Sequence, residues 1–154
     1  MKNLLVVCLV LSLGTLAAAQ SPKPELFTVA ERAGDPYPTY FFVWSTSAGN
    51  YIVRKDGMGE FTSPQGLRRV FYLKVGKSRL ERVYFLEHER DLFLLYEVGG
   101  QGYFLVRMEQ TKRKLRWSTA VGNLSGEDPS LSGDLIVIGT LQIREADGSV
   151  VKQE

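Results

Sequence analysis

The sequence predicts an all-β fold organised around an antiparallel meander, with about eight to ten strands in total. Four runs rich in aromatic and branched residues, a composition that favours strands, follow one another in the middle of the chain: residues 80–86, 92–98, 103–109 and 115–121. The polar segments between the runs are short enough for hairpins and too short for helical crossovers. No useful length of the chain shows the 3.6-residue apolar period of an amphipathic helix.

The apolar pattern distinguishes an outer strand from inner strands. In residues 115–121 apolar and polar side chains alternate, as expected of a half-exposed strand. In residues 92–98 both faces carry bulky groups, because Phe93 and Leu95 lie opposite their apolar neighbours. Leaving each of these two side chains in water would forfeit about 1.5–3 kcal/mol. We therefore expect an inner sheet that is covered on both faces, stacked between neighbouring sheets or backed by a second layer.

The amino terminus has the layout of a secretory signal peptide. Residues 1–3 form a short basic region, residues 4–13 an apolar core and residues 17–19 a small-residue cleavage site. The apolar core has about ten residues, fewer than the roughly 20 that a membrane-spanning helix needs. We expect cleavage near Ala19 and Gln20, which would give a secreted or periplasmic protein that does not span a membrane.

Beyond a signal peptide at residues 1–19, the sequence predicts an extended leader at residues 20–39 and a single all-β domain at residues 40–154. Within the leader, residues 26–33 could form either a strand or one helical turn. Around the meander, further strands are expected at residues 40–45, 51–54, 69–75 and 135–139, with a closing hairpin through residues 146–148.

The net charge argues against nucleic-acid binding, because it is close to zero: the chain has 19 basic and 17 acidic residues. Basic residues still gather around residues 68–79 and at a predicted hairpin tip, residues 112–116. They could keep edge strands from aggregating, or they could contact an anionic partner such as a cell-wall polymer or a lipid headgroup. In the second interpretation Lys112 and Arg113 are candidate partner contacts.

An aromatic cluster at residues 37–44 also has two interpretations. Its side chains could form part of the core. Alternatively, the neighbouring prolines could hold Tyr37 and Tyr40 outward as contacts for a partner, since rigid aromatic rings give contact area at a low entropic cost.

Catalytic and metal-binding patterns are weak. His88 is the only histidine and lies at a predicted hairpin tip between Glu87 and Glu89, where adjacent side chains point in different directions. The only cysteine, Cys8, falls within the signal peptide, so the mature chain would form no disulfide. No serine lies in the strand–turn–helix context of a nucleophile elbow. The sequence therefore nominates no catalytic residue, no metal ligand and no cofactor.

A strand, a polar turn and a second strand recur at residues 53–61, 107–117 and 143–152. Arg113 and Lys114 precede a strand-borne Trp117, and residues 128–134 lead into the apolar run 135–139. This pattern resembles the quinoprotein-like (PQQ-like) β-propeller repeat over residues 107–152. The resemblance implies an incomplete set of propeller-type blades, because a closed ring takes at least about four blades of roughly 40 residues.

The resemblance does not extend to quinone chemistry, because the quinone-dependent enzymes of that family carry a vicinal cysteine pair and this mature chain has no cysteine. The alternative folds are a closed small β-barrel and a β-sandwich. The expected function is a non-catalytic protein-binding or scaffold module with a protein or an envelope component as partner. A homo-oligomer that completes a ring is one form that this module could take. The alternatives are a small barrel that carries an apolar ligand and, less favoured, an extracellular hydrolase.

Overall fold

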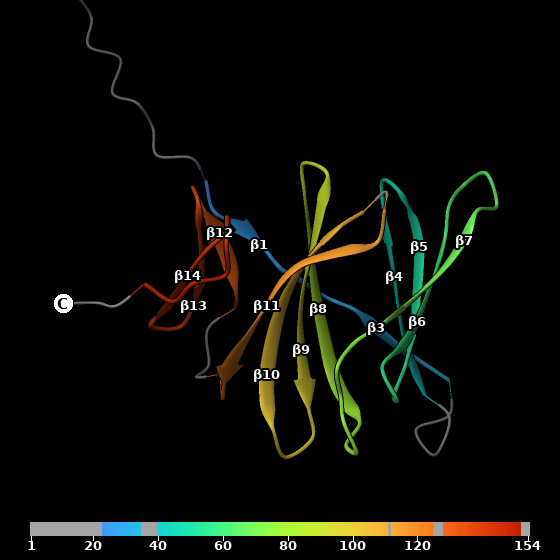
Figure 1. Ribbon diagram of the computed structural model, residues 1–154, viewed down its shortest axis with the longest axis horizontal. Helices are drawn as coiled ribbons and strands as arrows, with labels where there is room; N and C mark the ends of the chain where they lie inside the picture. The colour runs from blue at the N-terminus through green and yellow to red at the C-terminus, as the bar shows by residue number, and fades with distance from the viewer. Residues whose placement is uncertain (1–22, 35–39, 111, 125–127, 152–154) are drawn as a thin grey trace, which may run out of the picture.

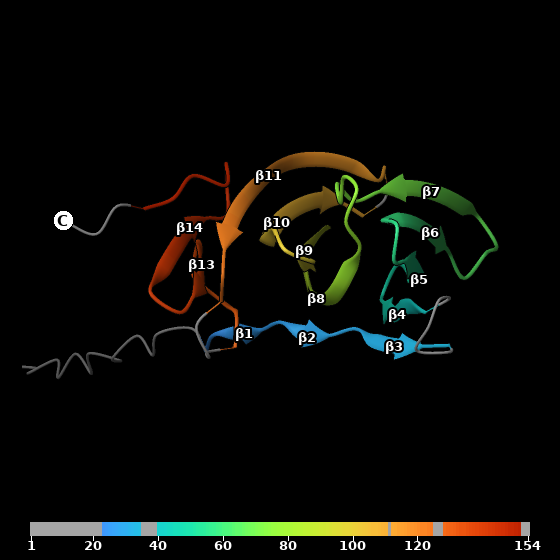
Figure 2. The ribbon, with the colours of Figure 1, turned by 90° about the horizontal axis from the view of Figure 1, so that it is seen from below.

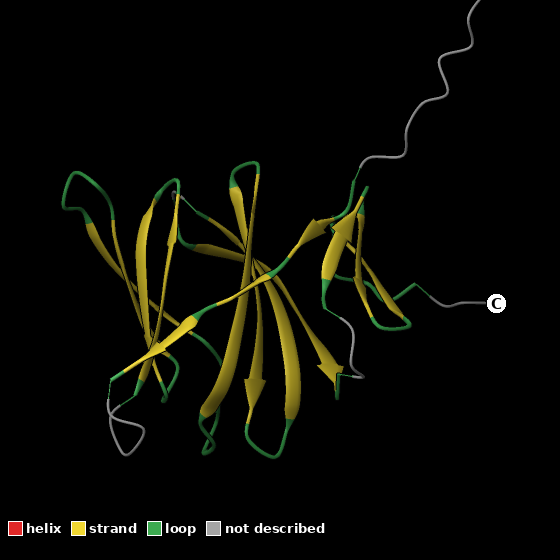
Figure 3. Cartoon of the chain, turned by 180° about the vertical axis from the view of Figure 1, so that it is seen from behind, coloured by secondary structure: helices red, strands yellow, loops and turns green. Residues whose placement is uncertain are grey.

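The computed structural model describes residues 23–34, 40–110, 112–124 and 128–151. Within these residues the protein has fourteen β-strands and no helix (Figure 3). All strand pairs are antiparallel, so the predicted all-β antiparallel meander is confirmed. The strands outnumber the expected eight to ten because four of them have only two or three residues, too few to give a pattern in the sequence.

Three sheets make up the molecule (Figure 1). The first sheet has the order β3-β4-β5-β6-β7: β3 (Glu31–Ala33), β4 (Phe41–Thr46), β5 (Gly49–Arg54), β6 (Met58–Thr62) and β7 (Arg68–Tyr72). The central sheet has the order β2-β8-β9-β10-β11: β2 (Thr28–Val29), β8 (Leu80–His88), β9 (Asp91–Val98), β10 (Gly102–Glu109) and β11 (Lys114–Gly122). The third sheet has the order β1-β12-β13-β14: β1 (Glu25–Leu26), β12 (Ser130–Ser132), β13 (Leu135–Ile138) and β14 (Leu141–Arg144).

The sheets are stacked with the central sheet in the middle (Figure 2). Leu94 and Tyr96 on one face of β9 belong to a buried cluster shared with the first sheet. Phe93 and Leu95 on the other face belong to a second buried cluster shared with the third sheet. The expectation of an inner sheet covered on both faces is thus confirmed, and stacking between neighbouring sheets is the form that it takes.

Each sheet is open within the described residues. β7, β11 and β14 are the terminal strands on one side, and the short strands β3, β2 and β1 are terminal on the other. None of the three sheets closes on itself, so the alternative of a closed small barrel is not the fold that the described residues adopt.

A leader segment, residues 25–33, crosses all three sheets in turn (Figure 3). β1 pairs with β12, β2 with β8 and β3 with β4. Between these pairings the Phe27 amide donates to the Pro129 carbonyl at 3.0 Å, and the Ala30 amide donates to the Val83 carbonyl at 2.8 Å. Of the two alternatives for residues 26–33, strand or helical turn, the structure therefore shows strand. The leader supplies a terminal strand to every sheet.

The leader segment has two buried side chains, and their positions are explained by the stacking of the three sheets. Phe27 lies in the cluster between the central and third sheets, and Ala30 lies in the cluster between the first and central sheets. Each fills the gap that the leader spans as it passes from one sheet to the next. One buried side chain per gap gives a spacing of three, which is neither the two-residue period of a strand nor the period of a helix.

The predicted signal peptide, residues 1–19, lies outside the described residues. In the part of the chain that the structure describes, no helix is long and apolar enough to cross a membrane.

Candidate functional site

Tyr40 lies in the core, the first of the two interpretations given for the aromatic cluster. Its side chain is 3% exposed, its hydroxyl donates to the Leu80 carbonyl at 2.7 Å, and the Arg32 guanidinium lies 3.8 Å from its ring centroid. Burial, followed by the charge of Glu81, raises the pKa of the Tyr40 hydroxyl. Tyr37, the second aromatic candidate, lies outside the described residues.

Lys112 and Arg113, both in the turn between β10 and β11, have different surroundings. Lys112 is exposed and forms an ion pair with Glu109 at 3.3 Å. Arg113 turns toward the first sheet, where its guanidinium carbon lies 3.3 Å from the centroid of the Phe61 ring. Of these two candidates, only Lys112 presents its charge mainly to solvent.

Part of each basic cluster lies on a terminal strand of a sheet. Arg68 and Arg69 lie on β7 and Arg116 lies on β11, and both strands end their sheets. Arg116 pairs with Glu109 at 2.9 Å and is about half exposed. Charged side chains on an open edge discourage pairing with another chain, so this placement agrees with the first interpretation of the basic clusters.

His88 lies near the start of the leader segment. Its Nδ1 atom is 3.1 Å from a carboxylate oxygen of Glu25 on β1. Among the residues that the structure describes, no group of three or more histidine, cysteine, aspartate or glutamate residues is placed to hold a metal ion.

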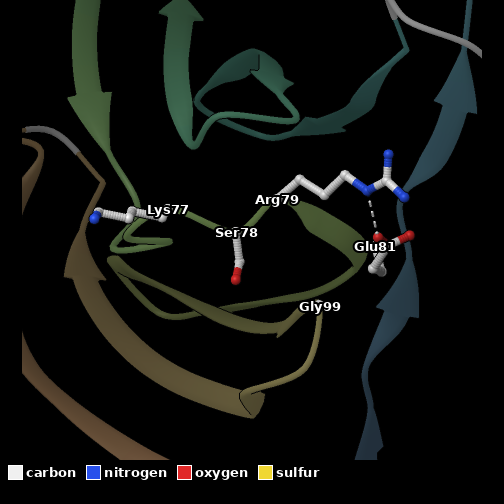
Figure 4. Close-up of a pocket in the computed structure, with 5 residues that line it drawn as sticks. All are labelled: Lys77, Ser78, Arg79, Glu81 and Gly99. Carbon is white, nitrogen blue, oxygen red and sulfur yellow. Dashed lines mark hydrogen bonds and ion pairs between the residues drawn. The ribbon is translucent and has the colours of Figure 1, made fainter.

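A polar hollow of about 380 Å³ lies where the chain enters β8, next to the turn that follows β9. Lys77, Ser78, Arg79, Glu81 and Gly99 line it (Figure 4). Arg79 pairs with Glu81 at 2.9 Å, and Lys77 points in the opposite direction from this pair. The charged ends therefore do not converge on one point, and the hollow does not form a built binding site.

The outer face of the first sheet exposes a set of apolar side chains. Ile52 is 45% exposed, Val70 51% and Tyr72 75%. Val43, Ile52, Glu60 and Val70 are successive cross-strand partners, and Met58 is paired with Tyr72 in the neighbouring row. A hollow of about 240 Å³ opens on the same face.

Two basic residues on this face are paired with carboxylates. Arg68 forms an ion pair with Glu60, and Arg54 pairs with Asp56 at 2.7 Å. Glu31, the cross-strand partner of Val43, adds an exposed carboxylate at the β3 end of the row. An apolar patch with a polar border is typical of a protein–protein contact surface.

Sequence reasoning did not nominate Ile52, Val70 or Tyr72. The signal was nevertheless present, because residues 51–53 and 70–72 are consecutive bulky apolar side chains that cannot all lie on one face of a strand. The same pattern in residues 92–98 led to the correct inference of a sheet covered on both faces. Here the inward set, including Tyr51, Val53 and Phe71, is buried, and the outward set is exposed.

Comparison with protein-family models and with curated protein sequences finds no match to this chain.

Proposed function

We propose that this protein is a secreted or periplasmic, non-catalytic binding module that contacts another protein through the outer face of its first sheet. The observation that carries the proposal is the exposure of Ile52, Val70 and Tyr72 together on that face. Large apolar side chains gathered on one surface are costly to leave in water and are a common feature of binding surfaces.

The proposed occupant is an apolar sheet face of the partner protein. Inside this molecule, both boundaries of the central sheet are sheet faces packed against sheet faces. The outer face of the first sheet continues this series of stacked faces. Its two arginines, Arg54 and Arg68, are already paired with carboxylates, so the middle of the face suits an apolar partner. A partner sheet packed there would extend the stack.

The resemblance to the PQQ-like β-propeller repeat supports the same proposal. Propellers are built from antiparallel meanders that stack face to face, and an incomplete set of blades leaves an end face without a neighbour. Here three stacked sheets leave the first sheet with such an end face. A second copy of the chain is one protein that could cover it.

The test is site-specific photo-crosslinking in the cells that produce the protein. A photoreactive phenylalanine analogue replaces Tyr72 in one variant and Leu115 in a matched control. Leu115 is a suitable control because it is 54% exposed but lies on β11 of the central sheet and not on the outer face of the first sheet. We expect a single adduct of defined mass from position 72 and none from position 115.

The partner identified in the adduct is then purified, and its affinity is measured for the unmodified protein and for Val70→Asp. A charge in the middle of the contact should weaken binding at least about tenfold, since an unpaired charge would become buried there. Because Val70 is 51% exposed, the melting temperature should change little. Equal adducts from both positions, or unchanged affinity of Val70→Asp, would overturn the proposal.

Light scattering of residues 20–154 reports whether the partner is a second copy. An adduct of twice the chain mass together with a dimer in solution would identify self-association. A monomer in solution with an adduct of a different mass would identify another protein.

No observation favours the alternative function, a carrier of an apolar ligand, because the spaces between the described sheets are filled by two clusters of buried side chains.

A further inference from the structure

The two ends of the stack present different surfaces (Figure 2). Among the described residues, the strands of the first sheet expose three large apolar side chains, Ile52, Val70 and Tyr72. The strands of the third sheet expose one, Leu26 on β1. The first sheet therefore matches the first sheet of a second copy better than it matches a third sheet.

The outer face of the first sheet differs in charge between its two terminal strands. Glu31 on β3 is exposed and lies in the row that continues through Val43 and Ile52 to β7. Arg68, on β7, pairs with Glu60, yet its side chain remains 70% exposed. The β3 edge of this face is thus acidic and the β7 edge is basic.

The size of the side chains also differs between these two edges. Tyr72 on β7 is 75% exposed and is paired with Met58. The Arg54 Nη1 atom lies 3.8 Å from the Met58 sulphur, and Arg54 is paired with Phe41, which is paired with Ala33 on β3. This row therefore ends in a large exposed ring at β7 and in a small side chain at β3.

We infer that the partner is a second copy of this chain, packed through the same face about a two-fold axis that runs along β5. The inference rests on the proposed contact through the outer face of the first sheet and names its occupant. Such an axis reverses the strand order of the second copy, so β3 faces β7 and β5 faces β5.

The differences between the two edges become complementary in this arrangement. Glu31 faces β7 of the second copy, two residues along that strand from Arg68. Tyr72 lies over the small side chain of Ala33 in the same way, and Ile52 meets its own copy at the axis. Each edge contact occurs twice, because a two-fold interface uses the same patch on both copies.

Other ways of joining two copies lack this match. A two-fold axis perpendicular to the strands would keep the strand order, set β3 against β3 and bring Glu31 beside Glu31. Like charges placed together disfavour a contact. Head-to-tail stacking of the first sheet on a third sheet would continue without closing, whereas the two-fold contact ends at a dimer.

The size of the face sets the expected strength of the dimer. Its five strands, about 4.8 Å apart, carry outward side chains in three rows about 7 Å apart, which is roughly 500 Å² of flat area per copy. This is at the small end for a specific interface. The dimer should therefore dissociate on dilution.

The first measurement is analytical ultracentrifugation of residues 20–154 at concentrations from about 1 to 500 μM, a range that covers the affinities expected of a small interface. We expect a reversible equilibrium between monomer and dimer with no larger species.

A charge exchange tests which edges meet. Glu31→Arg and Arg68→Glu should each weaken self-association at least about tenfold, because each places like charges together at two contacts. A mixture of the two variants should form a heterodimer that is tighter than either homodimer, since both contacts again join opposite charges. Glu89→Arg is the matched control, because Glu89 is exposed in the turn between β8 and β9, and it should associate like the unmodified protein.

Cysteine pairs test the direction of the axis. Residues 20–154 contain no cysteine, since the only one is Cys8. With a short bismaleimide, a mixture of Ala33→Cys and Tyr72→Cys should form a covalent dimer, and each variant alone should form little. Ile52→Cys should crosslink with itself, and Leu115→Cys, on β11, should not.

The outcomes separate this inference from the proposed function. A chain that stays monomeric, together with an adduct between position 72 and a different protein in cells, would overturn the second copy as partner and leave the contact face standing. The absence of any specific adduct at position 72 would overturn both. Growth beyond a dimer, or a mixture of Glu31→Arg and Arg68→Glu that associates no better than its components, would overturn the two-fold arrangement. If Arg68→Glu does not fold, the cysteine pairs decide the question.

Discussion

At the level of single residues, Arg107 joins the central sheet to the third sheet. Its Nε atom donates to Asp91 at 2.6 Å, and its Nη1 atom donates to the carbonyl of Glu145 at 2.7 Å. The same carbonyl accepts the indole N–H of Trp117 at 2.9 Å. The side chains of Arg107 and Asp91 are only 19% and 11% exposed, so the ion pair between them is largely protected from solvent.

Arg107→Met should therefore destabilise the protein strongly. It leaves the Asp91 carboxylate without its cation in a largely buried place, and breaking a buried pair in this way typically costs about 3–5 kcal/mol. The measurement is the free energy of unfolding in urea. Arg116→Met is the matched control, because Arg116 is half exposed and its ion pair should contribute no more than about 1 kcal/mol.

The Asp91→Asn, Arg107→Met double variant adds a second check. Its free energy of unfolding should be higher than that of Arg107→Met alone, since the uncompensated Asp91 carboxylate is then gone. If Arg107→Met and Arg116→Met lower the free energy of unfolding by similar amounts, Arg107 does not join the central sheet to the third sheet in the way that we describe.

Residue-level roles were harder to derive from the sequence than strand positions. Tyr40 and Arg113 were both reasonable surface candidates, because one follows prolines and the other lies in a basic turn. Their contacts, with Leu80 and with Phe61, come from distant parts of the chain. A single sequence carries no signal that those segments meet.

At the level of elements, the leader segment holds the three sheets by short pairings and two buried side chains. Phe27 is 7% exposed and packs between the central and third sheets. Its neighbour Leu26 is 62% exposed. The two residues have similar apolar side chains in opposite environments, which makes them a natural pair for comparison.

Phe27→Ala should lower the free energy of unfolding by about 3–5 kcal/mol, as expected when a large buried ring is removed and a cavity remains. Leu26→Ala should change it by no more than about 0.5 kcal/mol, because that side chain is mostly in water already. Urea unfolding followed by circular dichroism measures both. If the two variants lose similar stability, the leader does not hold the sheets in the way that we describe.

The hairpins of the central sheet were predictable because their turns and their apolar runs are adjacent in the sequence. The leader strands were not, since β1 and β2 have two residues each and pair with residues far along the chain. Two residues cannot display a period of two. The two buried positions of the leader, Phe27 and Ala30, are three residues apart, a spacing set by the gaps between sheets and not by the leader's own backbone.

At the level of the whole molecule, the doubly apolar pattern of residues 92–98 was sufficient to predict a sheet that is covered on both faces. It could not tell which strands would supply the covering layers. The first sheet and the third sheet bury their inner faces against opposite sides of β9, and Leu92, Phe93, Leu94 and Leu95 are fully buried as a result. This arrangement makes the central sheet the part of the molecule that is best protected from solvent.

Amide hydrogen exchange tests this arrangement directly. The amides of β9 should exchange only through global unfolding, because β8 and β10 flank this strand and a packed sheet covers each of its faces. The amides of β7 should exchange earlier by local opening, since β7 ends its sheet and its side chains are mostly exposed. In increasing urea, exchange in β9 should follow the global free energy of unfolding, while exchange in β7 should depend little on urea. Equally fast exchange in both strands would mean that the sheets separate readily in solution, and the stack would then not be the source of stability.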